Sequence, residues 1–272
     1  MGNDLKEKKI GIITFHNSYN CGSMLQAFAL QQVVDRLTGK DSEIIDFSNE
    51  GQQKLYSVRQ PNDSLKNVIK NIILAPWFKR IARNYESYER FKKNNFRLSN
   101  FPIHKSADLS DADYDIVVAG SDQIWNITIA DGDDAYFLPW VKSARKVAYA
   151  PSFGAKNIMD YAANPNRYAE YLRDFANLSI RERNGLEWLQ NLTGRDADLL
   201  LDPTLLLKRD DYAEIESHEL KLPPRYIFYY SPGYSRDINK LVNRISQKYN
   251  LPVIAFNTKT FYVKGKIGRA HV

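Results

Sequence analysis

A short polar segment, Gly120 to Trp125 (GSDQIW), holds the residues best suited to chemistry, and it directly follows the apolar run DIVVA at 115–119. A glycine at the end of a buried strand lets the backbone approach a ligand closely, and Ser121 adds a hydroxyl. Asp122 is a candidate general acid or base. Trp125 could stack on a sugar or close the floor of a site. The alternative for Asp122 is that its carboxylate only caps the following helical turn.

The stretch Lys9 to Leu30 predicts a second part of such a site. Its apolar run, Ile10–Phe15, ends in a polar loop, and a helical pattern begins near Ser23. A strand, a turn and a helix in this order place the loop at the carboxyl end of the strand, where open α/β sheets bind ligands. The unpaired N–H groups at the start of the helix could receive an anion.

Arg181 and Glu182 follow another short strand pattern, 178–180. A guanidinium can bind phosphate through two parallel hydrogen bonds, so Arg181 is a candidate anion ligand. A salt bridge between the two neighbours is the alternative. Cys21 is the only cysteine, which excludes an internal disulfide and a cysteine-based zinc site. We interpret it as a packed small side chain in preference to a nucleophile.

Several common chemistries lack their sequence patterns. No G-x-G-x-x-G follows the first strand, and neither G-x-x-x-x-G-K-[ST] nor G-x-S-x-G occurs. Dinucleotide-binding, P-loop and serine hydrolase functions are therefore not expected. His16, His104 and His218 are isolated from one another in the sequence, and no H-x-x-x-H pair exists. We therefore expect no metal site.

Apolar runs that end in polar turns recur along the chain and predict a parallel sheet with its site at one edge. We expect strands at 9–15, 43–47, 115–119, 146–150, 178–180 and 199–201, and helices at 23–37, 165–176 and 185–192. Segment 50–63 is expected to be a loop. Two helical patterns, 64–74 and 77–95, are separated at Pro76 and predict an inserted hairpin. A further strand, helix and strand are expected at 226–230, 237–249 and 252–256.

The net charge of +6 is concentrated between Lys79 and Arg97, where seven Lys or Arg residues accompany two acids. Aromatic residues recur there at helical spacing, which predicts a core-facing stripe in preference to exposed platforms for bases. We therefore expect no nucleic-acid partner and interpret the cations as a solvated face near an acidic ligand or a membrane surface. The chain has no apolar run near the ~20 residues of a membrane span and no signal-peptide pattern, so the expected location is the cytoplasm or the inner face of the membrane.

Four stretches taken together, in this order, resemble the polysaccharide pyruvyl transferase family: NSYNCGSMLQAFAL, DIVVAGSDQIWN, YFLPWVKSARKVAYAPSFG and SIRERNGLEWLQNLTGRDADLLLDPTLLL. The resemblance spans Lys9 to Leu207. It implies a glycosyltransferase-B-like architecture with a cleft between two Rossmann-like halves. It also implies transfer of a pyruvyl group from phosphoenolpyruvate, as donor substrate and without a separate cofactor, to a saccharide or lipid-linked glycan. The product would be a pyruvate ketal in a surface polysaccharide or exopolysaccharide.

The resemblance assigns roles to residues at the matching positions. Asp122 would be the acid or base, and Arg181 would hold the anionic donor. The remaining substrate-binding candidates come from the same strand ends: Asn17, Asn20, Gly22, Ser23, Gln26, Gly120, Ser121, Gln123, Trp125, Ser152 and Glu182. Family members also carry a serine-phenylalanine-histidine-glycine type of motif in the second half, and nothing in this sequence matches it.

The expected fold class is α/β, with a Rossmann-like parallel-sheet domain and the start of a second one. We expect the first domain at 1–207 with a helical insertion at about 64–96, a connector at 208–224 and a first βαβ unit at 225–266. Residues 267–272, IGRAHV, read like a translated sequencing adapter, so we expect a truncated chain that is inactive alone. Two other functions stay open: a non-catalytic carbohydrate- or partner-binding domain, and a nucleotide-sugar glycosyltransferase. The oligomeric state stays open too.

Overall fold

A computed structural model describes residues 8–217, 221–231, 235–256 and 266–269 of the chain. The chain divides into two compact units, one up to Ala213 and one from Glu214 onward. The predicted domain 1–207 lies within the first unit, and the division falls inside the predicted connector 208–224.

The first unit is built on a four-stranded parallel sheet in the order β2-β1-β3-β4. The strands are β1 (Lys9–Ile13), β2 (Ser42–Ile44), β3 (Tyr114–Gly120) and β4 (Arg145–Tyr149). In register, Ile12 of β1 lies opposite Ile44 on one side and Val118 on the other. The central strands are apolar because layers cover both faces of a parallel sheet. This arrangement confirms the predicted α/β class with a Rossmann-like sheet.

Two short strands continue the same region. β5 (Ser179–Ile180) and β6 (Asp198–Leu199) pair in parallel, and an isolated bridge joins Val147 of β4 to Asn177 just before β5. The carboxyl ends of these parallel strands face one way, so the turns that follow them collect at one edge. This is the edge of the sheet at which the sequence analysis predicts the polar site residues.

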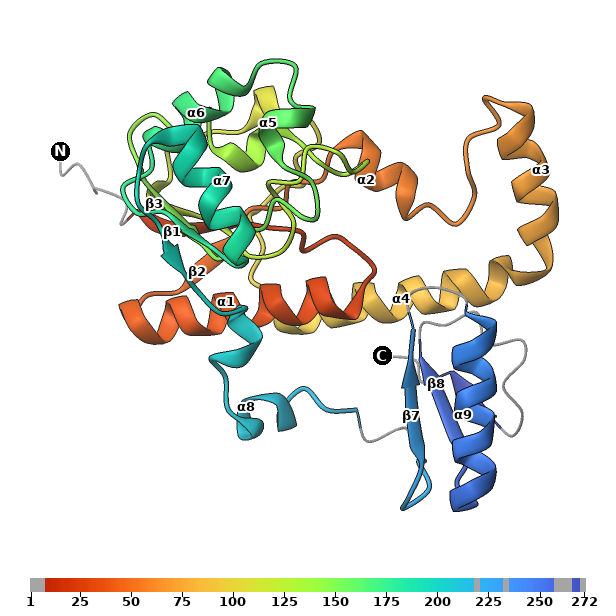
Figure 1. Cartoon of the computed structure of the whole chain (residues 1–272). Helices are drawn as coiled ribbons and strands as arrows, with labels where there is room; N and C mark the ends of the chain where they lie inside the picture. The colour runs from red at the N-terminus through yellow and green to blue at the C-terminus, as the bar shows by residue number, and fades with distance from the viewer. Residues whose placement is uncertain (1–7, 218–220, 232–234, 257–265, 270–272) are drawn as a thin grey trace, which may run out of the picture. The chain divides into compact units, whose positions relative to one another are not determined.

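Helices cover both faces of the sheet (Figure 1). On one side α1 (Cys21–Thr38) and α4 (Phe78–Asn95) run next to each other, and Phe28 contacts Phe91 across them. On the other side lie α6 (Pro165–Arg173) and α7 (Arg183–Thr193). The buried core that these helices close contains large aromatic side chains: Trp125, Tyr136, Phe137, Phe153 and Phe175.

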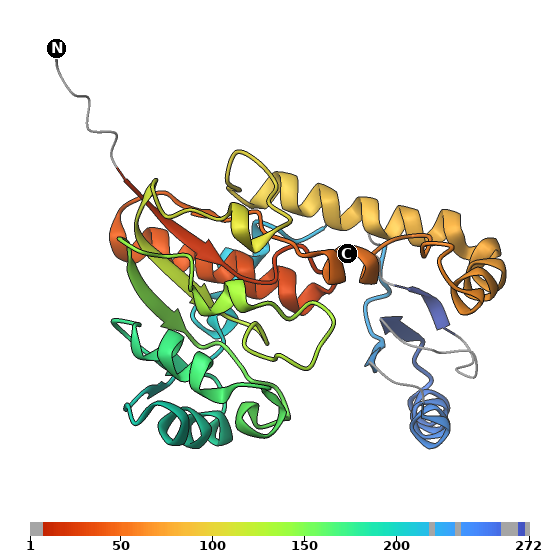
Figure 2. The ribbon, with the colours of Figure 1, turned by 90° about the horizontal axis from the view of Figure 1, so that it is seen from above.

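The insertion after β2 is helical, and Figure 2 shows α4 running beside α1 with its start reaching past the sheet to the helix that precedes it. α3 (Leu65–Leu74) is followed by a 3₁₀ turn at Ala75–Trp77 that contains Pro76, and then by α4. The prediction that 50–63 is entirely a loop was wrong, since α2 (Glu50–Leu55) lies within it. Asn49 starts this helix, because its side chain accepts a hydrogen bond from the Gln52 N–H at 2.8 Å.

The remaining elements of the first unit are short. They are α5 (Ile158–Tyr161), α8 (Arg209–Ala213) and the 3₁₀ turns at Ser106–Asp108, Asp134–Phe137 and Pro203–Leu205. Within the part of the chain that the structure describes, no helix has the length and apolarity needed to cross a membrane.

The second unit contains a three-stranded parallel sheet in the order β7-β8-β9. Its strands are β7 (Ile227–Tyr230), β8 (Val253–Phe256) and β9 (Lys266–Arg269), and α9 (Arg236–Tyr249) connects the first two. Ser235 caps α9 by accepting the Ile238 N–H. Of the segment 267–272, the first three residues belong to β9, and the last three lie outside the described residues.

Candidate functional site

Asp122 lies in the turn after β3, where two other strand-end segments meet it. The Ser23 hydroxyl in the first turn of α1 donates to Asp122 Oδ2 at 2.6 Å. From the turn after β4, the Ser152 N–H donates to the Asp122 carbonyl at 2.8 Å. The structure therefore brings together three segments, around residues 23, 122 and 152, that the sequence predicted for one edge of the sheet.

The backbone at Asp122 is left-handed, with φ of 67°. Its Oδ1 accepts the N–H of the next residue, Gln123, at 2.8 Å, where a turn closed by the Asn126 N–H and the Gln123 carbonyl begins. The carboxylate therefore does cap the following turn, and its second oxygen additionally accepts the Ser23 hydroxyl. The carboxylate is half-buried, so it remains open to a ligand while two donors fix its position. Gln123 itself is exposed beside it.

Buried polar groups support this turn from below. Gln26, 2% exposed, accepts the Ser121 N–H at 3.1 Å and donates to the Thr14 hydroxyl at 2.9 Å. Ser121 in turn donates to the Ala150 carbonyl at 2.6 Å. The predicted substrate contacts of Gln26 and Ser121 are therefore corrected, because both side chains are enclosed and occupied. They join the ends of β1, β3 and β4 and so position Asp122.

Gly120 and Ser152 also shape the chain at the ends of β3 and β4. Gly120 has φ of 144°, and a Cβ atom there would lie 2.0 Å from the Tyr149 carbonyl oxygen. Only glycine permits this close approach of β3 and β4. The Ser152 side chain is fully buried and accepts the Gly154 N–H at 2.9 Å, so it holds its own turn and does not face a substrate.

Trp125 belongs to the hydrophobic core. Its side chain has no exposed surface, and its ring stacks on Phe137 with centroids 5.7 Å apart. The indole N–H donates to the Tyr136 carbonyl at 3.1 Å. The expectation that Trp125 stacks on a sugar is corrected by this burial, and its second expected role, closing the floor beneath Asp122, fits the packing.

Arg181 has carboxylates on two sides. Its Nη1 lies 2.8 Å from Asp202 Oδ2 and its Nε lies 3.4 Å from Glu182 Oε1. Asp202 follows β6, and sequence reasoning missed it. The Arg181 side chain is 25% exposed, so part of the guanidinium can still meet an anion. The other Glu182 carboxylate oxygen, Oε2, is buried without a hydrogen-bond partner, which is costly for a charged group.

The loop after β1 is anchored by its own polar residues. Asn20 caps α1 by accepting the Gly22 N–H at 2.9 Å, and both residues are exposed. Asn17 accepts a hydrogen bond from the ammonium of Lys92 on α4. The Lys92 side chain is largely buried there and also pairs with Glu89 at 2.8 Å. The Lys92 ammonium is therefore one of the links between the inserted hairpin and this loop, beside the hydrogen bond from the Tyr19 hydroxyl to Glu89.

His16 and Cys21 do not form a nucleophilic pair. His16 is fully buried, with Nε2 2.9 Å from Asp46 Oδ1 and Nδ1 3.2 Å from the Thr14 carbonyl. Burial opposes ionisation of Asp46, but the His16 hydrogen bond and nearby cations outweigh it and lower the pKa of that carboxyl. Burial raises the pKa of the half-buried Cys21 thiol, so its thiolate is not favoured.

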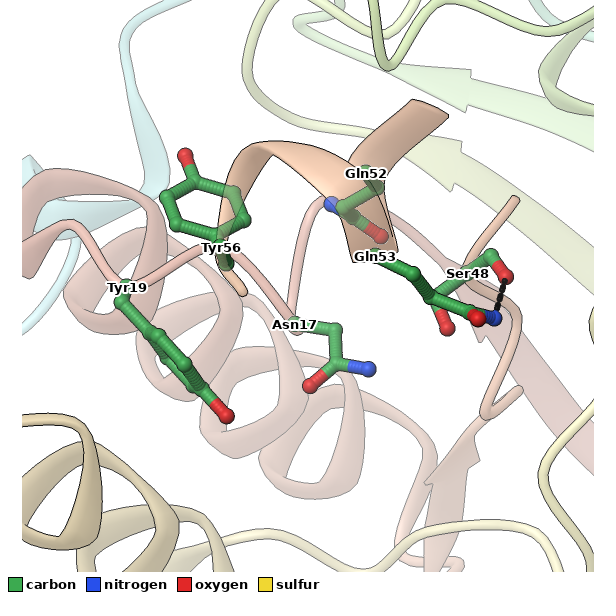
Figure 3. Close-up of a pocket in the computed structure, with 6 residues that line it drawn as sticks. All are labelled: Asn17, Tyr19, Ser48, Gln52, Gln53 and Tyr56. Carbon is green, nitrogen blue, oxygen red and sulfur yellow. Dashed lines mark hydrogen bonds between the residues drawn. The ribbon is translucent and has the colours of Figure 1, made fainter. Parts of the chain in front are cut away.

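A pocket with a volume of about 180 Å³ opens beside Asn17. Its lining comes from the loop after β1, the end of the β2 segment and α2, as Figure 3 shows: Asn17, Tyr19, Ser48, Gln52, Gln53 and Tyr56. Five of these six residues were not predicted as site residues, and three of the five lie in 50–63, which was expected to be an irregular loop. Among the described residues, no group of three or more His, Cys, Asp or Glu side chains could hold a metal ion.

The parallel sheet with helices on both faces defines a Rossmann-like α/β protein, and the carboxyl edge of such a sheet is where open α/β folds bind ligands. A family model described as polysaccharide pyruvyl transferase matches residues 20–260, most of the chain. The chain therefore belongs to the polysaccharide pyruvyl transferase family, which confirms the resemblance found in the sequence. No curated protein matched the chain.

Proposed function

We propose that this protein transfers a pyruvyl group from phosphoenolpyruvate to a pair of saccharide hydroxyls. A proton is added to the CH₂ carbon of the donor, and the two hydroxyl oxygens bond to the adjacent carbon as the bond from that carbon to the phosphate oxygen breaks. One hydroxyl proton is accounted for in the new methyl group and the other in the phosphate that leaves. The product is a pyruvate ketal on a surface polysaccharide or exopolysaccharide.

The observation that carries this proposal is the Asp122 carboxylate. It is half-buried at the sheet edge and held by Ser23 at 2.6 Å. A carboxylate in fixed geometry can take the proton of an attacking hydroxyl and return it later in the reaction. Arg181 follows β5 at the same edge, and its N–H donates to the Pro151 carbonyl in the turn that also binds Asp122. Its guanidinium suits the phosphate or carboxylate of the donor.

We also propose that the protein works in the cytoplasm against the inner face of the membrane, on a saccharide or a lipid-linked glycan. The support is α3, on which Leu65, Ile69, Ile72 and Ile73 are 48–77% exposed. Lys66 and Lys70 are exposed on the same helix. An apolar helix face flanked by cations is suited to the surface of an anionic membrane.

The test is a phosphate-release assay on the purified protein. Phosphoenolpyruvate is supplied with oligosaccharides, and the ketal is identified by mass spectrometry. We expect release to require a saccharide and to fall by about 10²–10⁴-fold in Asp122→Asn, as for loss of a general acid or base. Asp115→Asn, at the exposed start of the same strand, is the matched control. Undiminished rates in both Asp122→Asn and Arg181→Ala would contradict the assignment of roles, and no release by the wild type would contradict the function.

A further inference from the structure

The pocket beside Asn17 is lined by neutral polar groups and aromatic rings. Three of its side chains are amides, one carries an aliphatic hydroxyl and two are tyrosines, while none is charged. Figure 3 shows Tyr19 and Tyr56 on one side of the space, Ser48 and Gln53 on the other, and Gln52 between them. The two tyrosine rings lie 5.4 Å apart at an angle of 58°. Such a lining offers hydrogen bonds and apolar ring faces without a charge to attract an anion.

Gln52 leaves one polar atom of this lining unpaired. The residue is only 1% exposed, and its Nε2 donates to the Ser18 hydroxyl at 2.9 Å. Its Oε1 is buried and has no hydrogen-bond partner. Turning the amide over would exchange the two atoms and leave the nitrogen unpaired instead. A buried unpaired amide atom costs free energy, so its presence in the wall of a pocket points to a ligand that completes it.

The neighbouring side chains are already held in place. Gln53 Nε2 donates to the Ser48 carbonyl at 3.0 Å and lies 2.5 Å from His104 Nδ1. The Tyr19 hydroxyl donates to Glu89 at 2.5 Å. Because these contacts fix the wall before a ligand arrives, binding would cost little side-chain entropy.

The pocket also lies within electrostatic reach of the proposed acid or base. Burial is the main cause that raises the pKa of Tyr56, and the negative charges of Asp131 and Asp122 raise it further. The chain also links the two places, since the loop that lines the pocket at Asn17 and Tyr19 leads into the first turn of α1, where Ser23 donates to Asp122.

We propose that this pocket binds one neutral sugar ring of the acceptor saccharide, with the Gln52 amide oxygen accepting a sugar hydroxyl. This inference rests on the proposed function, because the bound sugar is an acceptor only in that reaction. Amide and hydroxyl groups match sugar hydroxyls, and tyrosine faces pack on the C–H surface of a pyranose ring. At about 180 Å³ the volume is below the roughly 300–1,000 Å³ of pockets for drug-sized ligands, which suits a single ring. The anionic donor has no partner charge among the lining residues.

The test measures sugar binding directly, without any chemistry. Methyl glycosides of glucose, galactose and N-acetylglucosamine are titrated into the protein and followed by saturation-transfer NMR. We expect at least one to bind, and Gln52→Met to weaken it by about tenfold, the equivalent of one hydrogen bond of ~1.4 kcal/mol. Tyr56→Leu should weaken it as well, and it serves as a second variant if Gln52→Met folds poorly. Gln31→Met makes the same exchange at a buried amide of α1 outside the pocket, and should bind the sugar as the wild type does.

The outcomes separate this inference from the proposed function. Sugar binding that depends on Gln52, without phosphate release from phosphoenolpyruvate, would support the pocket and contradict the reaction. Phosphate release with an acceptor KM unchanged in Gln52→Met would support the reaction and overturn the pocket. The inference would also be overturned if none of the three glycosides bound, or if Gln52→Met and Tyr56→Leu both bound the sugar as tightly as the wild type. Displacement of the bound sugar by phosphoenolpyruvate alone would assign the pocket to the donor instead.

Discussion

Substitution by methionine should change the free energy of unfolding differently at two buried glutamines, Gln31 and Gln52. Gln31 Nε2 donates to the carbonyls of Ser42, at 3.2 Å, and Arg97, at 3.0 Å, and its Oε1 accepts the Arg97 N–H at 3.1 Å. Methionine there removes all three hydrogen bonds. At about 1 kcal/mol each, the free energy of unfolding should fall by ~3 kcal/mol, with a further cost for the Arg97 N–H that loses this partner.

Gln52→Met removes fewer hydrogen bonds than Gln31→Met does. It breaks one hydrogen bond, to Ser18, worth about 1 kcal/mol. It also eliminates the buried unpaired Oε1, whose desolvation costs roughly 1–3 kcal/mol. Because methionine is close to glutamine in size and in helix propensity, the net change should lie near zero or be stabilising. The two variants should therefore differ by at least ~2 kcal/mol.

Urea unfolding followed by tryptophan fluorescence measures this difference, since all four tryptophans precede Ala213 and report on the first unit. In thermal unfolding the gap corresponds to roughly 4–8 °C in Tm, at ~2–4 °C per kcal/mol for a unit of this size. An equal loss of stability in both variants would refute the reasoning, because it would mean that the Gln52 amide is fully paired inside the folded protein.

Three further outcomes follow from contacts at the sheet edge and on α3. Gly120→Ala should lower the free energy of unfolding by at least ~3 kcal/mol, because its Cβ would lie 2.0 Å from a backbone oxygen; a wild-type urea midpoint would contradict this. Burial opposes ionisation of Asp111, but hydrogen bonds from four backbone N–H groups, those of residues 142–144 and its own, outweigh it and lower its pKa. Asp111 therefore contributes stability above its unfolded pKa of about 3.9, and this is lost as pH falls through the lower folded pKa; Asp111→Asn should show a shallower acid loss in urea titrations at stepped pH. Ile69→Ser with Ile72→Ser should reduce co-sedimentation with anionic vesicles, whereas Leu37→Ser, on the exposed end of α1, should not; equal binding by all three proteins would exclude α3 as the contact.

The sheet could be predicted from the sequence because its strands are short apolar runs, each ended by a polar turn. Tyr114–Gly120 and Arg145–Tyr149 differ from the expected 115–119 and 146–150 by only one residue at each end. The helix α2 could not be found this way. It has six residues, mostly polar, and lacks a repeated apolar face, so the Asn49 cap was its one signal.

For the site residues too, features set by the local sequence could be predicted, whereas contacts between distant residues could not. The position of Asp122 at a strand end followed from the local pattern, but its hydrogen bond from Ser23 joins residues 99 positions apart. Such a contact depends on the order of strands in the sheet, which composition and spacing do not encode. The burial of the Trp125 side chain could not be predicted either, because a tryptophan after a strand has the same local sequence whether its ring faces the core or a sugar.

The start of α2 fits closely against the loop that follows Trp125. A Cβ atom on Gly51 would lie 1.9 Å from the Ala130 carbonyl oxygen, and Asn49 Nδ2 donates to the carbonyls of Asp131 and Gly132 at 3.3 and 3.2 Å. For protein engineering, these contacts mean that residues 48–56 and 126–133 have to be exchanged together. A chimera that exchanges α2 between relatives should keep its fold only when the facing loop is exchanged with it, so altered selectivity of the proposed sugar pocket would have to be sought in paired libraries of both segments.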